Sequence, residues 1–317
     1  MNLVNLIIAQ VHPEAETVKQ AVEAFNPGEV ILNHVSNSSI EHPLIHLPTI
    51  MGINFSVTKH VFMLWVVAAT LFVVLTVLVR KYIRQTRLVP TGSMGVLEFG
   101  VEALRDSVIL PNVGKKWVNT WAPLILTFFF FILASNVIGL IPIFDGLALL
   151  DHYVLHTGEH SFLQRLIHGG STATGNFNVT AGLAVITFIA IIVAGIKAHG
   201  FVQHWKNIAP GGLPKFVYPM LIPMEIVGMF VRPFALTMRL AANMTGGHIA
   251  ILAILSFVFI FTEMLGSQVA AIGLGAVFSV PLATAISGLE IIVVLVQAYV
   301  FTLLSAVFIG MAIHSHH

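Results

Sequence analysis

Four regions of this chain are so apolar that each predicts one or two membrane-crossing helices. The first, 60–80, contains an uncharged run at 61–79, and its 19 residues match the roughly 20 that cross a hydrocarbon core of ~30 Å. Two more apolar stretches occupy 117–144 and 179–197. The last, 216–313, holds only five formally charged side chains and is long enough for two tilted helices. The pattern therefore predicts an all-α integral membrane protein with about five crossings.

Basic side chains cluster at particular ends of these stretches. Such clusters mark the cytoplasmic side of a membrane. If these clusters lie in the cytoplasm, the segments 1–59 and 145–178 lie outside, and the loop 198–215 and the C-terminus lie in the cytoplasm. The clusters are Arg80, Lys81, Arg84 and Arg87 after the first span, Lys115 and Lys116 before the second, and Lys197, Lys206 and Lys215 after the third.

The segment 88–116 has a different pattern from the spans. It carries Glu98, Glu102, Arg105 and Asp106 among apolar positions. That mixture predicts an amphipathic helix lying at the cytoplasmic interface.

The two long helices of 216–313 are expected to join near 263–268. Glycines follow that junction at 266, 273 and 275, with Pro281 after them. These residues predict a loosened start to the second long helix, because Gly and Pro are weak helix formers.

The composition agrees with a chain that is solvated largely by lipid. Hydrophobic residues make up 57% and charged residues 9%, whereas soluble domains carry about 25% charged residues. The absence of cysteine excludes disulfides, thiolate catalysis and cysteine-based metal sites. The first ten residues lack a basic segment, so we expect them to belong to the mature chain and not to a signal peptide.

The sequence gives only weak signals for metal binding or nucleotide chemistry. His152, His156 and His160 have the spacing of metal ligands on a helix, but Gly158 interrupts the pattern, so a solvated loop is favoured over a metal site. The chain has no glycine-rich phosphate-binding motif. We therefore predict no metal, no cofactor and no nucleotide chemistry in this chain.

The charges inside the last apolar region are the strongest functional signal. A charge at the centre of a spanning helix costs about 2.5–3.5 kcal/mol on insertion scales, so such residues usually serve a function. Arg239 is the sharpest case, because a guanidinium stays protonated at any ordinary pH. Glu225 and Arg232 precede it at intervals of seven, and Asn243 follows four residues later, so all four share one helix face. His248, nine residues after Arg239, falls about half a turn away from that face.

A second set of polar residues lies on the last predicted helix. Glu290 and Gln297 are seven residues apart and therefore share a face. If the two long helices run antiparallel, Glu290 lies at about the depth of His248. A His–Glu pair there can hold and pass a proton, because histidine titrates near neutral pH.

Structural interpretations stay open for each of these residues. Arg239 can pair with Glu290 in a buried salt bridge, and His248 can be a hydrogen-bonded core histidine. Glu225 and Arg232 can extend toward the membrane interface. The amides of Asn136, Asn243 and Gln297 can form hydrogen bonds between helices without a role in transport.

Several motifs resemble one known family. Residues 232–248 read RPFALTMRLAANMTGGH, which fixes an Arg, an Asn and a His at set positions in an apolar run. Residues 290–301 read EIIVVLVQAYVF, and 122–126 read APLIL, followed by Asn136 and Pro142. A weaker match is NVT at 178–180. Over about 90–317 the chain resembles subunit a of F-type ATP synthases.

The resemblance implies a proton-translocating stator subunit that couples proton flow to rotary ATP synthesis without doing nucleotide chemistry itself. It implies that Arg239 faces the carboxylate of a rotating c ring. It also implies that His248 and Glu290 belong to an outer half-channel. Glu225 would then belong to the cytoplasmic half-channel.

For the amides, the resemblance implies that Asn243 and Gln297 surround the proton path, and that Asn136 is a polar position of the second span. Some members carry an acid three residues later, where this chain has Gly139. The implied partners are a c-subunit ring, b-type peripheral stalk subunits and membrane lipid, with no nucleic acid and no directly bound nucleotide. The implied location is a bacterial plasma (inner) membrane.

Two other classes of function stay open. A secondary transporter predicts inverted repeats or paired broken helices, and the sequence shows no internal repeat. A structural membrane anchor predicts that Arg239 serves only to pair with Glu290.

Overall fold

The computed structural model describes residues 43–45, 47–50, 53–54, 56–84, 90–141, 151, 173–207, 216–265 and 268–314. Contacts divide the chain into two compact units. One comprises Met1–Ser36 and Thr245–Ile291, and the other comprises Asn37–Met244 and Ile292–His317. The histidines considered as metal ligands, His152, His156 and His160, lie outside the described residues, as do the first ten residues.

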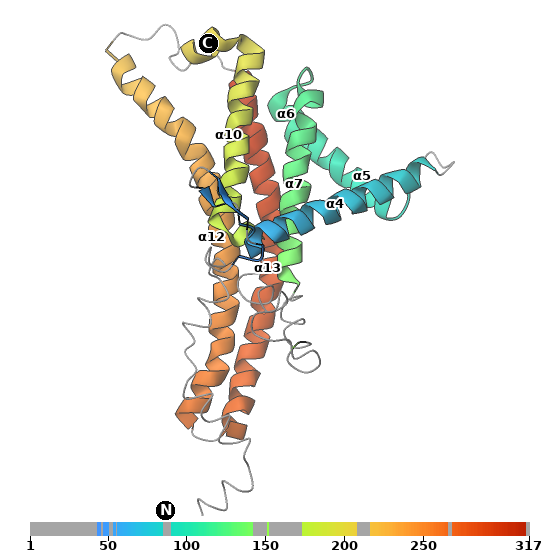
Figure 1. Ribbon diagram of the computed structural model, residues 1–317, viewed down its shortest axis with the longest axis vertical. Helices are drawn as coiled ribbons and strands as arrows, with labels where there is room; N and C mark the ends of the chain where they lie inside the picture. Colours follow the sequence, from blue (N-terminus) through green and yellow to red (C-terminus); the bar gives the residue numbers. More distant parts are fainter. Residues whose placement is uncertain are drawn as a thin grey trace, which may run out of the picture. The chain divides into compact units, whose positions relative to one another are not determined.

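Within the described residues, five helices are long and apolar enough to cross a membrane (Figure 1). The apolar parts of the last two extend over 40 and 37 residues. The predicted fold class, an all-helical protein with about five spans of which the last two are long, is therefore confirmed. The five are α4 (Lys59–Ile83), α7 (Val118–Leu140), α10 (Phe177–His199), α12 (Tyr218–Leu265) and α13 (Gln268–Ile313).

The long helices continue through residues that break helices in water. Pro223 and Pro233 lie inside α12, and Pro281 lies inside α13. Helix α13 runs unbroken from Gln268 through Gly273, Gly275 and Pro281, whereas Gly266, the first glycine of the predicted loosening, lies outside the described residues. Lipid offers no hydrogen-bond partners to an opened backbone, so a proline or glycine that would end a soluble helix is tolerated here.

Three short helical elements fall within the segment predicted to lie at the interface. They are α5 (Ser93–Leu104), the π-helical turn η1 (Arg105–Ile109) and α6 (Leu110–Val113). Gly114 ends this run with a φ of 82°, a conformation that favours glycine. Its location at a membrane interface stays a prediction.

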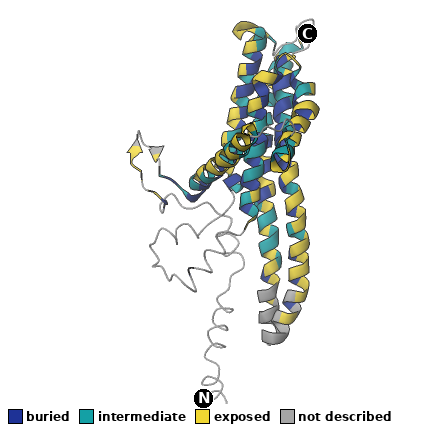
Figure 2. Cartoon of the chain, turned by 90° about the vertical axis from the view of Figure 1, so that its right-hand side faces the viewer, coloured by how far each residue is buried: buried dark blue, intermediate teal, exposed yellow. Residues whose placement is uncertain are grey.

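The larger unit has one apolar core in which α7 and α13 meet. Ile125 and Ile132 of α7 are fully buried, and Phe128 packs edge-on against Phe301 with ring centroids 5.6 Å apart. The buried positions of these helices appear in dark blue in Figure 2. At one end of this core, Nε2 of His199 on α10 lies 2.9 Å from the carbonyl of Ile313, the last residue of α13.

Span α4 differs from the others because only its first turns are buried. Met63 and Val67 are buried, whereas Phe72 is 72% exposed and Val73 is 56% exposed. An apolar helix with so little covered surface is suited to direct contact with lipid acyl chains.

Three pieces of secondary structure were not predicted. A small antiparallel hairpin pairs β1 (Thr49–Ile50) with β2 (Ile53–Asn54) just before α4. The 3₁₀ turn η3 (Ala173–Gly175) precedes α10, and the short helix α11 (Phe201–Lys206) follows it. Strands of two residues carry too little alternation of polar and apolar positions to be recognised from a sequence.

Candidate functional site

Arg239 lies on the exposed face of α12. One side of the helix is buried through Leu236, Leu240 and Met244, which recur every four residues. Arg239 and Asn243, one turn apart, are both exposed on another side. The Arg239 guanidinium makes no ion pair with any described residue of its own unit. A permanent positive charge is therefore exposed on this side of α12, one turn from the amide of Asn243.

Arg232, seven residues earlier, has the opposite environment. Its Nη2 donates to Oε1 of Glu225 at 3.2 Å. Its guanidinium also lies over the ring of Phe308 on α13, 5.6 Å from the centroid. Both members of the ion pair are partly exposed. The interval of seven residues thus brings Glu225 and Arg232 together, as the helix register predicts.

The smaller unit contains the predicted His–Glu pair. Nε2 of His248 on α12 lies 3.9 Å from Oε1 of Glu290 on α13. Glu290 is only 4% exposed, and neither carboxyl oxygen has a hydrogen-bond partner among the described residues. The two side chains therefore lie next to each other, and a small rotation of either one would bring them within hydrogen-bond distance. In enzymes, hydrogen bonds that carry protons are often long before the substrate binds.

Gly247 makes room for the Glu290 carboxyl group. A methyl group at position 247 would lie 2.7 Å from Oε1 of Glu290, which is closer than real contacts allow. Glu290 thus packs directly over the helix backbone next to His248. The structural use of Gly247 is therefore the close approach of a carboxyl group, which a residue without a side chain permits.

Asn136 has a buried partner that the sequence did not reveal. The hydroxyl group of Thr174, in η3, donates to Oδ1 of Asn136 at 2.5 Å, and both residues are fully buried. Within the described part of the chain, Nδ2 of Asn136 and Oγ of the neighbouring Ser135 have no hydrogen-bond partner. The two partners are 38 residues apart, and no periodic pattern connects residues at that separation.

Gln297 is 8% exposed on α13, in the larger unit. Among the described residues of that unit, no hydrogen bond joins Gln297 or Asn243 to another predicted site residue. The structure thus brings together His248 with Glu290, and Glu225 with Arg232, but not the amides with one another.

His204 on α11 is a titratable group that the sequence did not single out. Its imidazole ring packs directly against Gly195 of α10, where a methyl group would collide with it. Nε2 is buried and makes no hydrogen bond to a described residue. Burial lowers the pKa of His204 below its ordinary value, and the nearby His199 lowers it further. The geometry at Gly195 makes His204 a packing residue between α10 and α11.

The sequence of the chain matches the ATP synthase A chain family over residues 61–310. The chain belongs to this family. It is 37% identical to ATP synthase subunit a of Pelodictyon phaeoclathratiforme over 94% of this chain and 81% of the relative. It is 40% identical to ATP synthase subunit a 2 of Chlorobium luteolum over 90% of this chain and 75% of the relative.

A relative from a different group is ATP synthase subunit a of Myxococcus xanthus, which is 38% identical over 84% of this chain and 75% of the relative. Membership identifies the chain as a multi-pass membrane subunit of the ATP synthase complex. It is the proton-translocating, non-catalytic component of the membrane sector.

Proposed function

We propose that Arg239 is the residue at which proton translocation is coupled to movement of a partner subunit, a c ring that carries one carboxylate per subunit. The single observation that supports this role is the exposed Arg239 guanidinium, which has no ion-pair partner in its own unit. Coulomb attraction is strong in a low-dielectric environment, so Arg239 attracts an ionised carboxylate that passes it. Because a guanidinium keeps its proton, it also blocks direct leakage of protons along this face.

His248 and Glu290 form the proton-accepting part of the outer half-channel in this proposal. An imidazole and a carboxyl group 3.9 Å apart can exchange a proton after a small movement. Protons would reach a ring carboxylate from this pair. Gln297 and Asn243 would supply hydrogen-bonding groups along the path.

Glu225 belongs to the cytoplasmic half-channel, through which the ring carboxylate releases its proton near Arg239. The Glu225 carboxylate lies 3.2 Å from the guanidinium of Arg232 on the same helix, and both side chains are partly exposed. Asn136 contributes a polar position in the second span, held by Thr174. The concentration of basic residues at 80–87, 115–116 and 197–215 supports a cytoplasmic location for these ends and an outside N-terminus.

The proposed partners are the c ring at Arg239, b-type peripheral stalk subunits and lipid, in a bacterial plasma (inner) membrane. The anchor alternative gives Arg239 no role beyond structural pairing. The secondary-transporter alternative requires paired broken helices, whereas α12 and α13 are each continuous.

The decisive experiment is Arg239→Ala in the complete complex, with Arg232→Ala as the matched control on the same helix. We expect Arg239→Ala to abolish ATP-driven proton pumping into inverted membrane vesicles while the complex still assembles. Arg232→Ala should keep most of the pumping. Pumping at the wild-type rate in Arg239→Ala would overturn the proposal, and so would equal losses in the two variants.

A further inference from the structure

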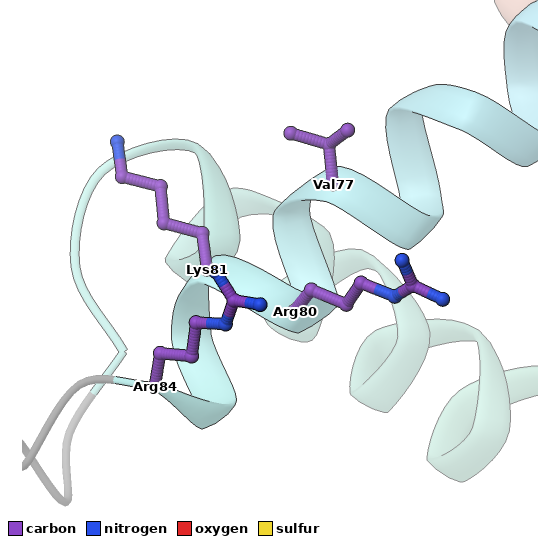
Figure 3. A pocket seen from close by; sticks show the side chains of 4 residues that line it. All are labelled: Val77, Arg80, Lys81 and Arg84. Atoms are coloured by element: carbon purple, nitrogen blue, oxygen red, sulfur yellow. The ribbon is translucent and has the colours of Figure 1, made fainter.

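A second cationic site lies at the end of α4, away from the residues proposed for proton transfer. Val77, Arg80, Lys81 and Arg84 line an open pocket of about 500 Å³. That volume lies within the ~300–1,000 Å³ range of ligand pockets. Figure 3 shows the four side chains on successive turns of the helix, with Arg80 and Lys81 extending in different directions.

The charges of this pocket are not neutralised within the described chain. None of Arg80, Lys81 and Arg84 forms an ion pair with a described residue. Three like charges within five residues repel one another, so the arrangement favours a bound anion. Cations in the last turn of a helix are also stabilised by the helix dipole. The dipole alone, however, does not require these side chains to line a common pocket.

The surroundings of the pocket indicate what kind of anion it accepts. Val77 is 57% exposed, and the preceding turn adds Val73 at 56%. Arginine and lysine stems extend this apolar surface, with their charged groups at its end. A ligand that matches both parts has an anionic head and an apolar tail.

We propose that the pocket formed by Val77, Arg80, Lys81 and Arg84 binds an anionic phospholipid. The phosphodiester group lies among the guanidinium and ammonium groups, which recognise phosphate by charge and hydrogen bonds. An acyl chain lies along the exposed valines of α4. Clusters of basic residues next to a membrane span commonly bind anionic headgroups. The proposal needs only that the chain spans a membrane, so it does not depend on the roles assigned to Arg239, His248 and Glu290.

The test measures which lipid lies next to α4 in the complete complex. The chain has no cysteine, so Val73→Cys gives a unique attachment point in this subunit for a fluorophore, one turn away from the pocket. The other subunits should carry no accessible cysteine. The complex is reconstituted with phosphatidylcholine containing equal mole fractions of nitroxide-labelled phosphatidylglycerol or nitroxide-labelled phosphatidylcholine. Quenching of the fluorophore reports the local concentration of each labelled lipid.

We expect the labelled phosphatidylglycerol to be enriched about tenfold over phosphatidylcholine at this position. Arg80→Gln with Arg84→Gln should remove the enrichment, and Arg80→Lys with Arg84→Lys should keep most of it. Lys115→Gln with Lys116→Gln removes the same number of exposed charges elsewhere and should leave the enrichment unchanged.

Three results would overturn the proposal. Equal quenching by the two lipids would show that the pocket does not select an anionic headgroup. Enrichment that persists in the double Gln variant would place the lipid elsewhere. Loss of the enrichment on adding inorganic phosphate at constant ionic strength would identify a site for a free anion instead of a lipid.

Discussion

Two arginines of α12 lie one above the other on the helix, but only one of them has a partner within its unit. Arg232 pairs with Glu225 at 3.2 Å and lies over the Phe308 ring. Arg239 is exposed and makes no ion pair with a described residue of that unit. Inserting a guanidinium into a membrane is costly in both cases. The difference teaches that the cost is offset within the chain for Arg232, whereas no described residue of its unit forms an ion pair that offsets it for Arg239.

The largest effect should come from exchanging Arg239 for lysine. Lysine keeps the charge, but a desolvated ammonium can lose its proton, and it cannot form the paired hydrogen bonds of a guanidinium. We expect Arg239→Lys to lower ATP-driven pumping by about a hundredfold, comparable to removing one essential electrostatic group from an active site.

Arg232→Lys is the matched comparison for that variant. A lysine at 232 still reaches Glu225, and a partly exposed ion pair contributes little, so pumping should stay within about twofold of the wild-type rate. Both variants are measured by fluorescence quenching in inverted vesicles, normalised to the amount of assembled complex. Similar losses in the two variants would remove the distinction between a paired and an unpaired arginine.

A smaller loss should follow from displacing Glu290. In Gly247→Ala the new methyl group meets the Glu290 carboxyl, which must then move away from His248. A misplacement of about 1 Å costs up to a hundredfold in a reacting site, so we expect pumping to fall by about tenfold.

The control for this variant is Gly273→Ala, on α13 in the same unit. A methyl group at 273 meets no other atom within 4 Å, and alanine favours a helix. Pumping should therefore be unchanged. A normal rate in Gly247→Ala would mean that the close packing of Glu290 beside His248 has no part in proton transfer.

These sites differ in how far the sequence alone could predict them. The five spans follow from hydropathy, because lipid exposure requires long apolar helices. The shared face of Glu225 and Arg232 follows from helix register, and the nearness of His248 and Glu290 follows from antiparallel packing, whereas the ion pair between Glu225 and Arg232 was not predicted. Each of these contacts is observed at 4 Å or less.

Other features could not be predicted, because they depend on atoms rather than on spacing. The partner of Asn136, Thr174, lies in a three-residue turn without a recognisable pattern. The use of Gly247 depends on where one carboxyl group packs. The continuity of α13 through Pro281 contradicted a rule drawn from soluble helices. The proton-transfer roles of the seven candidate residues stay predictions, since geometry alone does not report proton movement.

Removing the hydrogen bond between Thr174 and Asn136 should lower the stability of the protein without changing its charge. Thr174→Val keeps the shape of the side chain and removes its hydroxyl group, so the buried Oδ1 of Asn136 loses a donor. Leaving a buried acceptor unsatisfied costs about 1–3 kcal/mol. Thr187→Val is the control, because that buried hydroxyl bonds only to the Leu183 carbonyl of its own helix. When the complex is heated, we expect the Thr174→Val subunit to dissociate at a lower temperature than the Thr187→Val subunit. Equal temperatures would argue against a structural role for the contact between α7 and η3.

The smallest effect concerns the ion pair that distinguishes Arg232. A double-mutant cycle of Glu225→Gln and Arg232→Gln isolates the coupling between the two side chains. Because both are partly exposed, we expect a coupling of about 0.5 kcal/mol, measured by unfolding in mixed detergent micelles. A coupling above about 2 kcal/mol would indicate a fully desolvated pair. Arg232 would then be a structural charge whose loss unfolds the helix, and it would be a poor control for Arg239. A weak coupling has the opposite meaning: Arg232 is dispensable, so the two arginines can be compared by function alone.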